Sequence, residues 1–240
     1  MNRFKGVISK DYDLVIQALP FYFESQNAVV EAIAAQYTTP IVVDIGLGTG
    51  LTTQAIIEKN PRCRVSGVDN ERAMMEQASV NLGIEIEKGS VQVYYSDALD
   101  YLRSLPNESV DVVASSYTIH NCPRDYRAQL EADIFRVLKP GGMFINNDKY
   151  AAEDRQEYVR EITEQIIRYD VLKDKGRDDL RRIWIEHEIE DGLPERIMWI
   201  DESLEQLKNV GFVRIEVVRR IGQYAIVAAY KRASTASPYA

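Results

Sequence analysis

A run of three closely spaced glycines constrains the fold of this chain more than any other feature of its sequence. Residues 42–50 read VVDIGLGTG, an apolar run of strand type followed by Gly46, Gly48 and Gly50. Glycines permit a sharp turn and let a ligand approach the backbone closely. A helix is predicted to follow, and its N-terminus offers free N–H groups. The segment therefore predicts a strand, a ligand-binding turn and a helix in succession.

Strand-like and helix-like segments alternate on both sides of this turn. We predict strands at residues 40–45, 64–68, 91–95, 110–114 and 143–147, and helices at residues 49–59, 71–82, 98–105 and 127–138. The last of these helices shows Leu130, Ile134 and Val137 at helical spacing. Such alternation predicts an α/β fold of Rossmann-like type, with a mostly parallel, doubly wound sheet and helices on both faces.

The order of elements changes after the fifth predicted strand. Lys139-Pro140-Gly141-Gly142 reads as the turn that stops the fourth helix. Residues 150–187 are polar and helical, and a helix at 201–210 is expected to begin at Asp201 as its N-cap and to stop at Gly211. Two β-rich runs, 212–219 and 224–230, then flank Ile221-Gly222-Gln223 and predict a terminal hairpin.

These segments divide one predicted domain, residues 1–240, into five parts. They are an N-terminal helical lid at 1–38, a cofactor-binding core at 39–149, a helical insert at 150–200, a helix and hairpin at 201–232, and a tail at 233–240.

Composition excludes several other classes of protein. The net charge is −8, so a basic face for nucleic acid is not expected. No apolar run reaches the roughly 20 residues of a membrane span, and the first residues lack the apolar stretch of a signal peptide. The two cysteines form no CxxC pattern, which favours a reducing compartment. We expect a cytoplasmic protein without a membrane partner.

The spacing of the glycines also separates cofactors. It is GxGxG rather than GxGxxG, and no Lys or Arg lies between Ile41 and Ile57 to meet the pyrophosphate of NAD or FAD. S-adenosylmethionine carries a cationic sulfonium and no phosphate, which suits the acid at Asp44. We therefore expect S-adenosylmethionine as the cofactor, with Asp44 and Thr49 among its contacts. A tight turn without any ligand is the alternative.

Polar residues follow three further predicted strands. Asp69 and Asn70 come after the second strand, Asp97 and Ala98 after the third, and Ser115 after the fourth. The carboxyl ends of parallel strands share one edge, where ligands of open α/β sheets bind. An acid such as Asp69 can accept hydrogen bonds from a ribose diol, and Asp97 can meet an adenine amino group. The alternatives are a solvated turn acid or helix cap for Asp69 and an N-cap for Asp97.

Together with LKPGG at residues 138–142, these segments resemble the class I S-adenosylmethionine-dependent methyltransferases. The resemblance implies the strand order 3-2-1-4-5-7-6, with the last strand antiparallel. It also implies that the three glycines line the methionine part of the cofactor, Asp69 the ribose and Asp97 the adenine.

Four segments resemble the carboxy-S-adenosylmethionine synthase group and its small-molecule methyltransferase relatives. They are LPFY at residues 19–22, SYTIH at 116–120, DKY at 148–150 and RIWIE at 182–186. The resemblance implies that Arg182 holds a carboxylate. His120 stands where that group has a glutamine, so the synthase activity does not follow from the resemblance.

Few residues are candidates for acid–base chemistry or for binding the methyl acceptor. His120 follows the fourth strand and suits a base near pH 7, or else caps a helix or is satisfied in the core. His187 is the other histidine and could face the substrate. Two histidines among scattered acids predict no metal site. Asp148 and Lys149 end the fifth strand, where they bind a polar acceptor or pair with each other at the rim.

Aromatic residues surround the expected position of the methyl group. Tyr12, Tyr22 and Tyr117 offer faces that attract a cationic sulfonium or acceptor. We expect Tyr22 to contact the cofactor and Tyr117, together with His120, to act in catalysis. Packing of the N-terminal helices is the alternative for Tyr12, and Trp184 and Trp199 are expected in the core of the lid.

Methyl transfer to a small polar molecule is the function these features favour. The alternatives are synthesis or use of a modified S-adenosylmethionine such as the carboxy form, a binding module without catalysis, and RNA methylation, which the charge of −8 disfavours. The sequence leaves open the acceptor and a homodimeric state.

Overall fold

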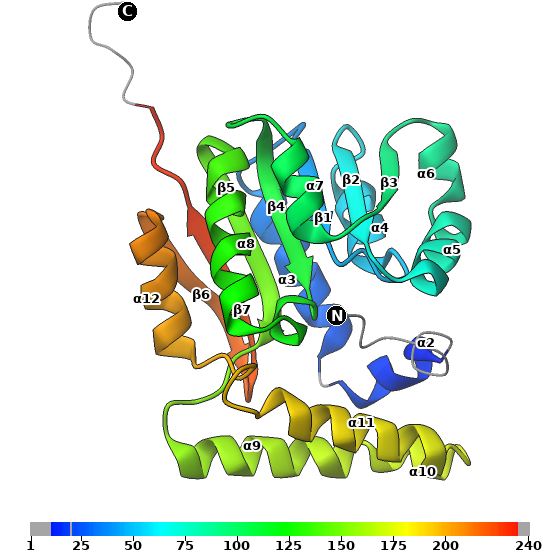
Figure 1. Ribbon diagram of the computed structural model, residues 1–240. Coiled ribbons are helices and arrows are strands. Elements are labelled where there is room, and N and C mark those ends of the chain that lie inside the picture. Colours follow the sequence, from blue (N-terminus) through cyan, green and yellow to red (C-terminus); the bar gives the residue numbers. More distant parts are fainter. Residues whose placement is uncertain (1–10, 20, 235–240) are drawn as a thin grey trace, which may run out of the picture.

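A computed structural model describes residues 11–19 and 21–234 and shows one seven-stranded sheet. The strand order is β3-β2-β1-β4-β5-β7-β6, and β7 runs antiparallel to both of its neighbours (Figure 1). Both features confirm the predicted fold. The strands are β1 (Ile41–Ile45), β2 (Arg64–Asp69), β3 (Val91–Tyr95), β4 (Val110–Ser116), β5 (Leu138–Lys149), β6 (Arg214–Ile221) and β7 (Tyr224–Tyr230).

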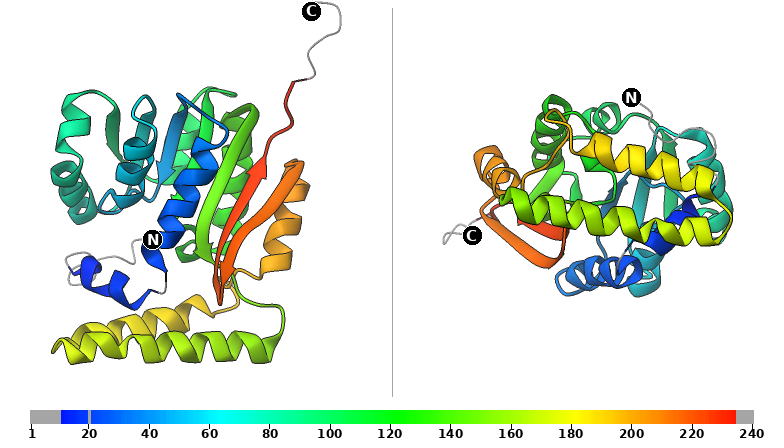
Figure 2. Two further views of the ribbon diagram at one scale, coloured as in Figure 1. Left: turned by 180° about the vertical axis from the view of Figure 1, so that it is seen from behind. Right: turned by 90° about the horizontal axis from the view of Figure 1, so that it is seen from below.

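Helices cover both faces of this sheet (Figure 2). One face packs against α7 (Ala98–Ser104), α8 (Arg124–Val137) and α12 (Ile200–Val210), and the other against α3 (Tyr22–Ala34), α4 (Leu51–Lys59) and α5 (Arg72–Asn81). The short helix α6 (Gly83–Glu87) follows α5. Buried aliphatic residues of the strands alternate between these two cores, as the βαβ pattern requires.

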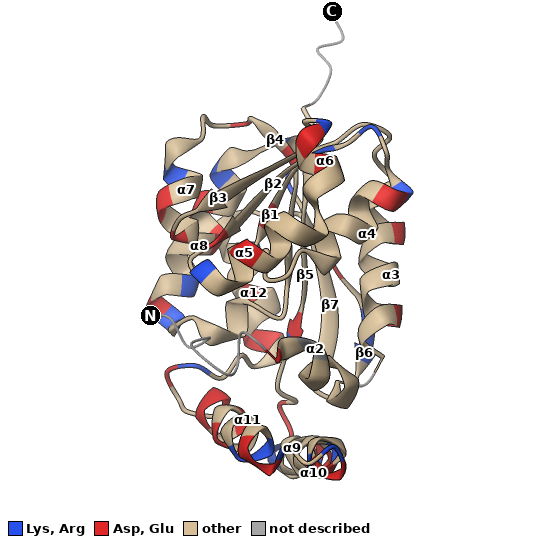
Figure 3. Ribbon diagram, turned by 90° about the vertical axis from the view of Figure 1, so that its right-hand side faces the viewer, with Lys and Arg blue, Asp and Glu red and all other residues tan. Residues whose placement is uncertain are grey.

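A second group of helices forms a cap beyond the carboxyl ends of the strands (Figures 1 and 2). It contains α9 (Arg155–Arg168), α10 (Asp170–Asp174) and α11 (Asp178–Asp191) together with α2 (Tyr12–Val15) and η1 (Ile16–Ala18). A separate apolar cluster holds the cap together and includes Trp184, as expected for this residue; its other buried members are Val15, Ala18, Tyr169, Leu172 and Leu180. Acidic and basic positions mix along α9 to α11 (Figure 3).

Parts of the predicted lid, tail and Pro-containing segment fall on residues 1–10, Pro20 and 235–240, which lie outside the described residues. Within the described residues, no helix combines the length and the apolar character that crossing a bilayer requires.

The start of α12 differs from the prediction. The helix begins at Ile200, and its N-cap position is Trp199 rather than Asp201. Asp201 lies in the first turn, where its negative charge is favourable at the positive end of the helix dipole, so a residue typical of helix starts is found one position inside the helix. Gly211 ends the helix with φ +122, as predicted.

Strand β5 is longer than predicted and begins at Leu138, which was expected as the last residue of the preceding helix, so it runs through the expected turn. Its first pair is Leu138 with Val110, and the next is Met143 with Val112, so the intervening residues form a bulge. At the other end, β7 pairs with β5 as far as Lys149 and Tyr224. The hydrophobic pattern did not predict this extension, because its last residues, Asp148 and Lys149, are charged and yet buried. The hairpin turn at Gly222, with φ +56, confirms the predicted connection of β6 to β7.

Candidate functional site

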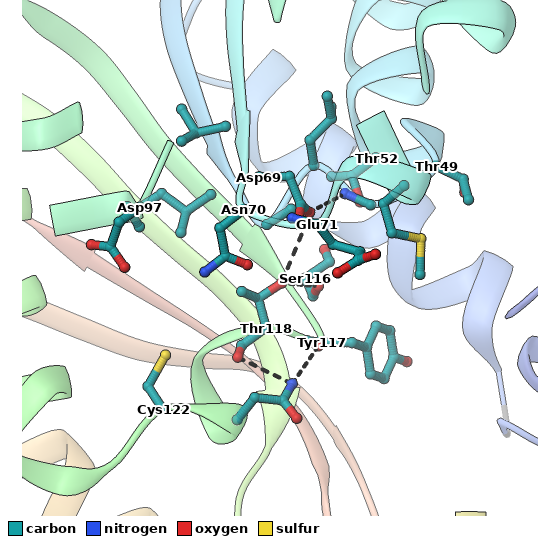
Figure 4. A pocket seen from close by; sticks show the side chains of 18 of the residues that line it. Thr49, Thr52, Asp69, Asn70, Glu71, Asp97, Ser116, Tyr117, Thr118 and Cys122 are labelled. Atoms are coloured by element: carbon teal, nitrogen blue, oxygen red, sulfur yellow. Dashed lines mark hydrogen bonds between the residues drawn. The ribbon is translucent and has the colours of Figure 1, made fainter. Parts of the chain in front are cut away.

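A large pocket opens at the carboxyl ends of β1, β2 and β4 and at the start of α7 (Figure 4). The glycine loop, the segment after β2 and the segment after β4 form its walls. This is the edge at which open α/β sheets bind ligands, because the chain leaves β1 and β4 toward helices on opposite faces of the sheet and so opens a crevice between the two connections. The location matches the one predicted from the sequence.

The glycine loop has the backbone conformation that its sequence predicts. Gly46, Gly48 and Gly50 have φ values of +73, +56 and +90, which side chains with a Cβ rarely adopt. A Cβ on Gly46 would also overlap the side chain of Thr118, which lines the pocket directly beside it. Gly46, Gly48 and Thr49 line the pocket. Gly50, at the start of α4, packs against Leu82 at the end of α5 instead.

Asp69 ties the end of β2 to the glycine loop. Its Oδ2 accepts a hydrogen bond of 2.8 Å from the Gly48 N–H, and its Oδ1 accepts one of 2.8 Å from the Glu71 N–H. Burial raises the pKa of Asp69, and the backbone bonds oppose that rise. Asn70 and Glu71 line the pocket beside it. Glu71 was missed because nothing in the sequence separates it from an ordinary first-turn acid.

Asp97 is the N-cap that one of the two alternatives predicted, and it also lies at the pocket. It caps α7, since its Oδ1 accepts from the Leu99 N–H at 2.9 Å, and it lines the pocket together with Ala98. The Tyr126 hydroxyl donates to the same oxygen at 2.8 Å, so two donors fix this carboxylate.

Asp44 lies beneath the glycine loop rather than on the pocket wall. It is buried, and its Oδ2 accepts a 2.6 Å hydrogen bond from the Thr53 hydroxyl. Burial raises the pKa of Asp44 to about 7, against the lowering effect of Thr53. Ser115 is also buried behind the wall, and its neighbour Ser116 lines the pocket instead. Asp44 therefore supports the glycine loop from behind, and Ser115 supports the end of β4.

The charge of the pocket wall has one sign. Asp69, Glu71 and Asp97 line it, and none of the described lining residues is Lys or Arg. A wall of this kind attracts a cation and repels phosphate. It fits the cationic sulfonium of the expected cofactor and not a pyrophosphate.

Tyrosines close the pocket on the side of the cap. Tyr22 and Tyr117 stack with ring centroids 5.3 Å apart and, with Tyr12, line the pocket. Tyr117 has φ +52, which is strained for an aromatic residue, and its N–H is held by the Asn147 carbonyl at 2.8 Å. Burial raises the pKa of the Tyr117 hydroxyl, so the ring presents a neutral face.

His120 lies behind the wall, in η2 (Ile119–Asn121), and does not line the pocket. Its Nδ1 is 2.5 Å from Asp148 Oδ1, and its backbone N–H donates to Asp148 Oδ2 at 3.1 Å. Both residues are buried. The structure therefore brings His120 and Asp148 together as a pair, with the Nε2 edge of the ring directed toward the cap, 3.7 Å from Asp191 Oδ2.

Lys149 forms a buried ion-pair network with α11. Its Nζ lies 2.8 Å from Glu188 Oε2 and 2.7 Å from Asp191 Oδ2. Burial lowers the pKa of Lys149, but Asp191 and Glu188 outweigh that effect and raise it well above its usual value. Tyr169 and Gln223 donate to the two oxygens of Glu188, both at 2.8 Å. Neither acid was identified from the sequence, where they look like solvated positions of a polar helix.

The two candidates on α11 lie on different faces of the helix. His187 is buried, and its Nε2 is 3.1 Å from Asn121 Oδ1, at the pocket wall. Arg182 pairs with Asp178 at 2.8 Å, and its side chain is 75% exposed. Five residues at about 100° each separate the two directions by roughly 140°. The structure does not bring Arg182 to the pocket.

Comparison with known proteins agrees with this geometry. A family described as "Methyltransferase domain" matches residues 42–142. A carboxy-S-adenosyl-L-methionine synthase of Nautilia profundicola is 26% identical over 91% of this chain and 89% of its own length.

Solved structures share the fold at low identity. One is a Methanococcus maripaludis protein described as a candidate S-adenosyl-L-methionine-dependent methyltransferase, with a TM-score of 0.66, 16% identity and coverage of 98% of this chain and 97% of that one. Another is Haemonchus contortus phosphoethanolamine N-methyltransferase 2 in complex with S-adenosyl-L-methionine, with a TM-score of 0.61, 16% identity and coverage of 86% and 52%.

Residues 42–142 thus match a methyltransferase domain, and the sheet order is the one that the resemblance to the class I S-adenosylmethionine-dependent methyltransferases implied. Over 91% of its length the chain is similar to a carboxy-S-adenosyl-L-methionine synthase.

Proposed function

We propose that this enzyme transfers the methyl group of S-adenosylmethionine to a small polar molecule. The observation that carries the proposal is the pocket wall, which joins the glycine loop to three carboxylates and contains no Lys or Arg among its described residues. The cap of α2, η1 and α9 to α11 lies over the same edge of the sheet, and a covered site of this kind suits a small acceptor better than a macromolecule.

Specific roles follow for the residues of the wall. Gly46, Gly48 and Thr49 hold the methionine part, Asp69 and Asn70 the ribose, and Asp97 and Ala98 the adenine. Asp44, Gly50 and Ser115 support the loop and the β4 end from behind.

The cofactor supplies an electrophilic methyl group, and the protein supplies orientation and exclusion of water. Tyr22 and Tyr117 present aromatic faces at the cap side of the pocket, where a positive charge is stabilised.

The acceptor is expected between the tyrosines and α11. Asn121 lines the pocket and also contacts His187, so it connects the cofactor site to the buried network of the cap. Tyr117, which lines the pocket, is our candidate catalytic residue, and His120, which Asp148 holds behind the wall, is a positioning residue. Lys149 is paired with Glu188 and Asp191. We therefore propose that it fixes the position of these two acids and does not contact the acceptor itself.

A modified cofactor is the second candidate. It is supported by the carboxy-S-adenosylmethionine synthases among the relatives. The carboxylate of that product needs a cationic partner, and the exposed Arg182 does not supply one. A mass spectrum of the ligand that copurifies with the protein separates the candidates: a mass larger than S-adenosylmethionine by a carboxylate favours the second.

Binding and turnover test the main proposal. Isothermal titration calorimetry should show saturable binding of S-adenosylmethionine and S-adenosylhomocysteine. Release of S-adenosylhomocysteine should then be followed with panels of small amines, alcohols, thiols and carboxylic acids. Absence of binding to either cofactor form overturns the proposal, and binding without turnover on any acceptor favours a binding module.

We further propose a cytoplasmic enzyme that does not act on nucleic acid. The support is the net charge of −8 and the two cysteines, which are unpaired. Salt-sensitive affinity for RNA would contradict the second point. Light scattering measures the molar mass in solution and so tests for a homodimer.

A further inference from the structure

We propose that His120, Asn121, His187 and Asp191 form a binding site for a divalent transition metal of the zinc type, beside the acceptor end of the pocket. The four residues come from η2 and from α11, two segments far apart in the sequence. Neither the resemblance to known families nor the spacing of the two histidines indicates such a site.

The donor atoms converge from two directions. His120 Nε2 is 3.7 Å from Asp191 Oδ2, and His187 Nε2 is 4.0 Å from Asp191 Oδ1. Asn121 Oδ1 is 3.1 Å from His187 Nε2. The ligand atoms of the two histidines and Asp191 all lie within 4.8 Å of one another. Two ligands of one tetrahedral zinc ion are about 3.4 Å apart, so small inward movements complete the site.

Neighbouring groups orient the donors, as they do around protein-bound metals. Asp148 holds His120 Nδ1 at 2.5 Å, which directs Nε2 toward the centre of the cluster. The Asn121 amide donates to the carbonyls of Tyr117 and Thr118 at 3.3 and 3.2 Å, so its oxygen faces His187. A carboxylate on the far nitrogen of a metal-bound histidine is a recurrent arrangement that fixes the ring.

The charges around the cluster leave room for a divalent cation. Asp148, Glu188 and Asp191 are buried carboxylates, and Lys149 is the buried ammonium that contacts two of them. The carboxyl groups of this arrangement outnumber its ammonium by two. Buried charges of one sign are unfavourable unless they are compensated. One divalent cation balances them.

Two other cations lie nearby and do not fill this role. Arg127 is buried and interacts with Glu131 first and with Asp148 less strongly, and it donates to the carbonyls of Cys122 and Arg196, so its charge is matched mainly by Glu131. Arg196 is only partly buried and donates to the Asn121 carbonyl.

Lys149 competes with a metal at Asp191. Its Nζ contacts Oδ2, whereas Oδ1 faces His187. A carboxylate can bind a metal through one oxygen and an ammonium through the other, so both cations fit. A metal there is adjacent to Asn121, which lines the pocket, and would hold an oxygen or nitrogen of the acceptor. That role depends on the proposed function, but metal binding itself does not.

Metal content provides the first test. Chelator-treated protein is dialysed against Zn²⁺ or Co²⁺, and bound metal is measured by elemental analysis. We expect one equivalent per chain in the wild type and a loss of that equivalent in His187→Ala and Asp191→Asn. Glu186→Gln is the matched control, because Glu186 is an exposed acid on the same helix. Asp148→Asn should weaken binding by about 10- to 100-fold.

Fluorescence locates the metal without altering its ligands. The ring of Trp184 is 5.0 Å from His187, and Trp199 packs on Tyr158 instead. In Trp199→Phe, Co²⁺ should therefore quench the remaining tryptophan as it binds. Wild-type protein that takes up no stoichiometric metal overturns the inference, and so does metal that leaves Trp184 unquenched. Metal that binds to a protein without methyl-transfer activity still supports the metal site. The metal site and the proposed function can therefore fail separately.

Discussion

The two halves of the site are built on different principles. The half at β1, β2 and α7 holds its polar groups with backbone hydrogen bonds, as at Asp69, whose partners Glu71 and Gly48 lie 2 and 21 residues away within the same βαβ segment. The half at β5, η2 and α11 buries ionisable side chains against one another, as at Lys149 and Glu188. The first half is a local motif, whereas the second exists only when the cap is closed on the sheet.

This difference has consequences for mutation. A change in the cofactor half should alter ligand affinity while leaving the fold intact. A change in the cap half should destabilise the protein, because removing one partner leaves a buried charge uncompensated. We expect the largest effect of mutation at Lys149, which is buried under the cap, and the smallest at Arg182, which is exposed on α11.

Replacing the buried ammonium should have the largest effect. In Lys149→Met the carboxylates of Glu188 and Asp191 lose their partner, and we expect the free energy of unfolding to fall by about 3–5 kcal/mol. Lys139→Met is the control in the same strand, since its pair with Asp111 is partly exposed and should contribute at most about 1 kcal/mol. Urea unfolding measures both. Equal losses would show that the cap network is no different from a surface pair.

A side chain in the glycine loop should weaken cofactor binding next. Gly46→Ala forces a Cβ against Thr118, and overpacking of this kind costs about 1–3 kcal/mol, which is roughly a 10- to 100-fold loss of affinity. Gly89→Ala is the matched control, because Gly89 has nearly the same φ, +74, and no atom lies within 4 Å of the position that its Cβ would take. Calorimetry with S-adenosylhomocysteine compares them. The same affinity in both variants would contradict the close approach at Gly46.

The buried carboxyl beneath the loop should make stability depend on pH. Burial raises the pKa of Asp44 to about 7, so in the folded state it keeps its proton where the unfolded chain has lost it. Its contribution is complete below about pH 4 and falls by up to about 1.4 kcal/mol per unit as pH rises toward 7. Asp44→Asn should flatten the profile of melting temperature against pH over this range. Exposed Glu58→Gln should leave it unchanged, and an unaltered slope in Asp44→Asn would exclude this carboxyl as the source.

The smallest effect is expected at Arg182. Its side chain is largely exposed and pairs with Asp178 on the outer face of α11. Arg182→Ala should change stability by no more than about 0.5 kcal/mol and leave cofactor affinity as it was. A large loss of affinity for a carboxylated cofactor would restore the carboxylate-binding role that the resemblance implied.

Sequence reasoning succeeded where contacts are local. The glycine loop, the Asp97 cap and the hairpin at Gly222 depend on backbone conformation over a few residues, and all three are present. It failed at Asp201, because an acid near a helix start is compatible with both the cap and the first turn. It also ended β5 too early, since no pattern of hydrophobicity marks Asp148 and Lys149 as buried strand residues.

The chain's own periodicity and glycines determine the doubly wound sheet, the position of the cofactor loop and the preference for a cation there, because these follow from backbone geometry and from charge near the loop. Only the tertiary structure decides which way each face of α11 points. It buries His187, Glu188 and Asp191 against η2 and β5 and leaves Arg182 in solvent. Long-range burial of charge depends on partners that no local pattern names, so the acceptor half of the site becomes visible only when the chain is folded.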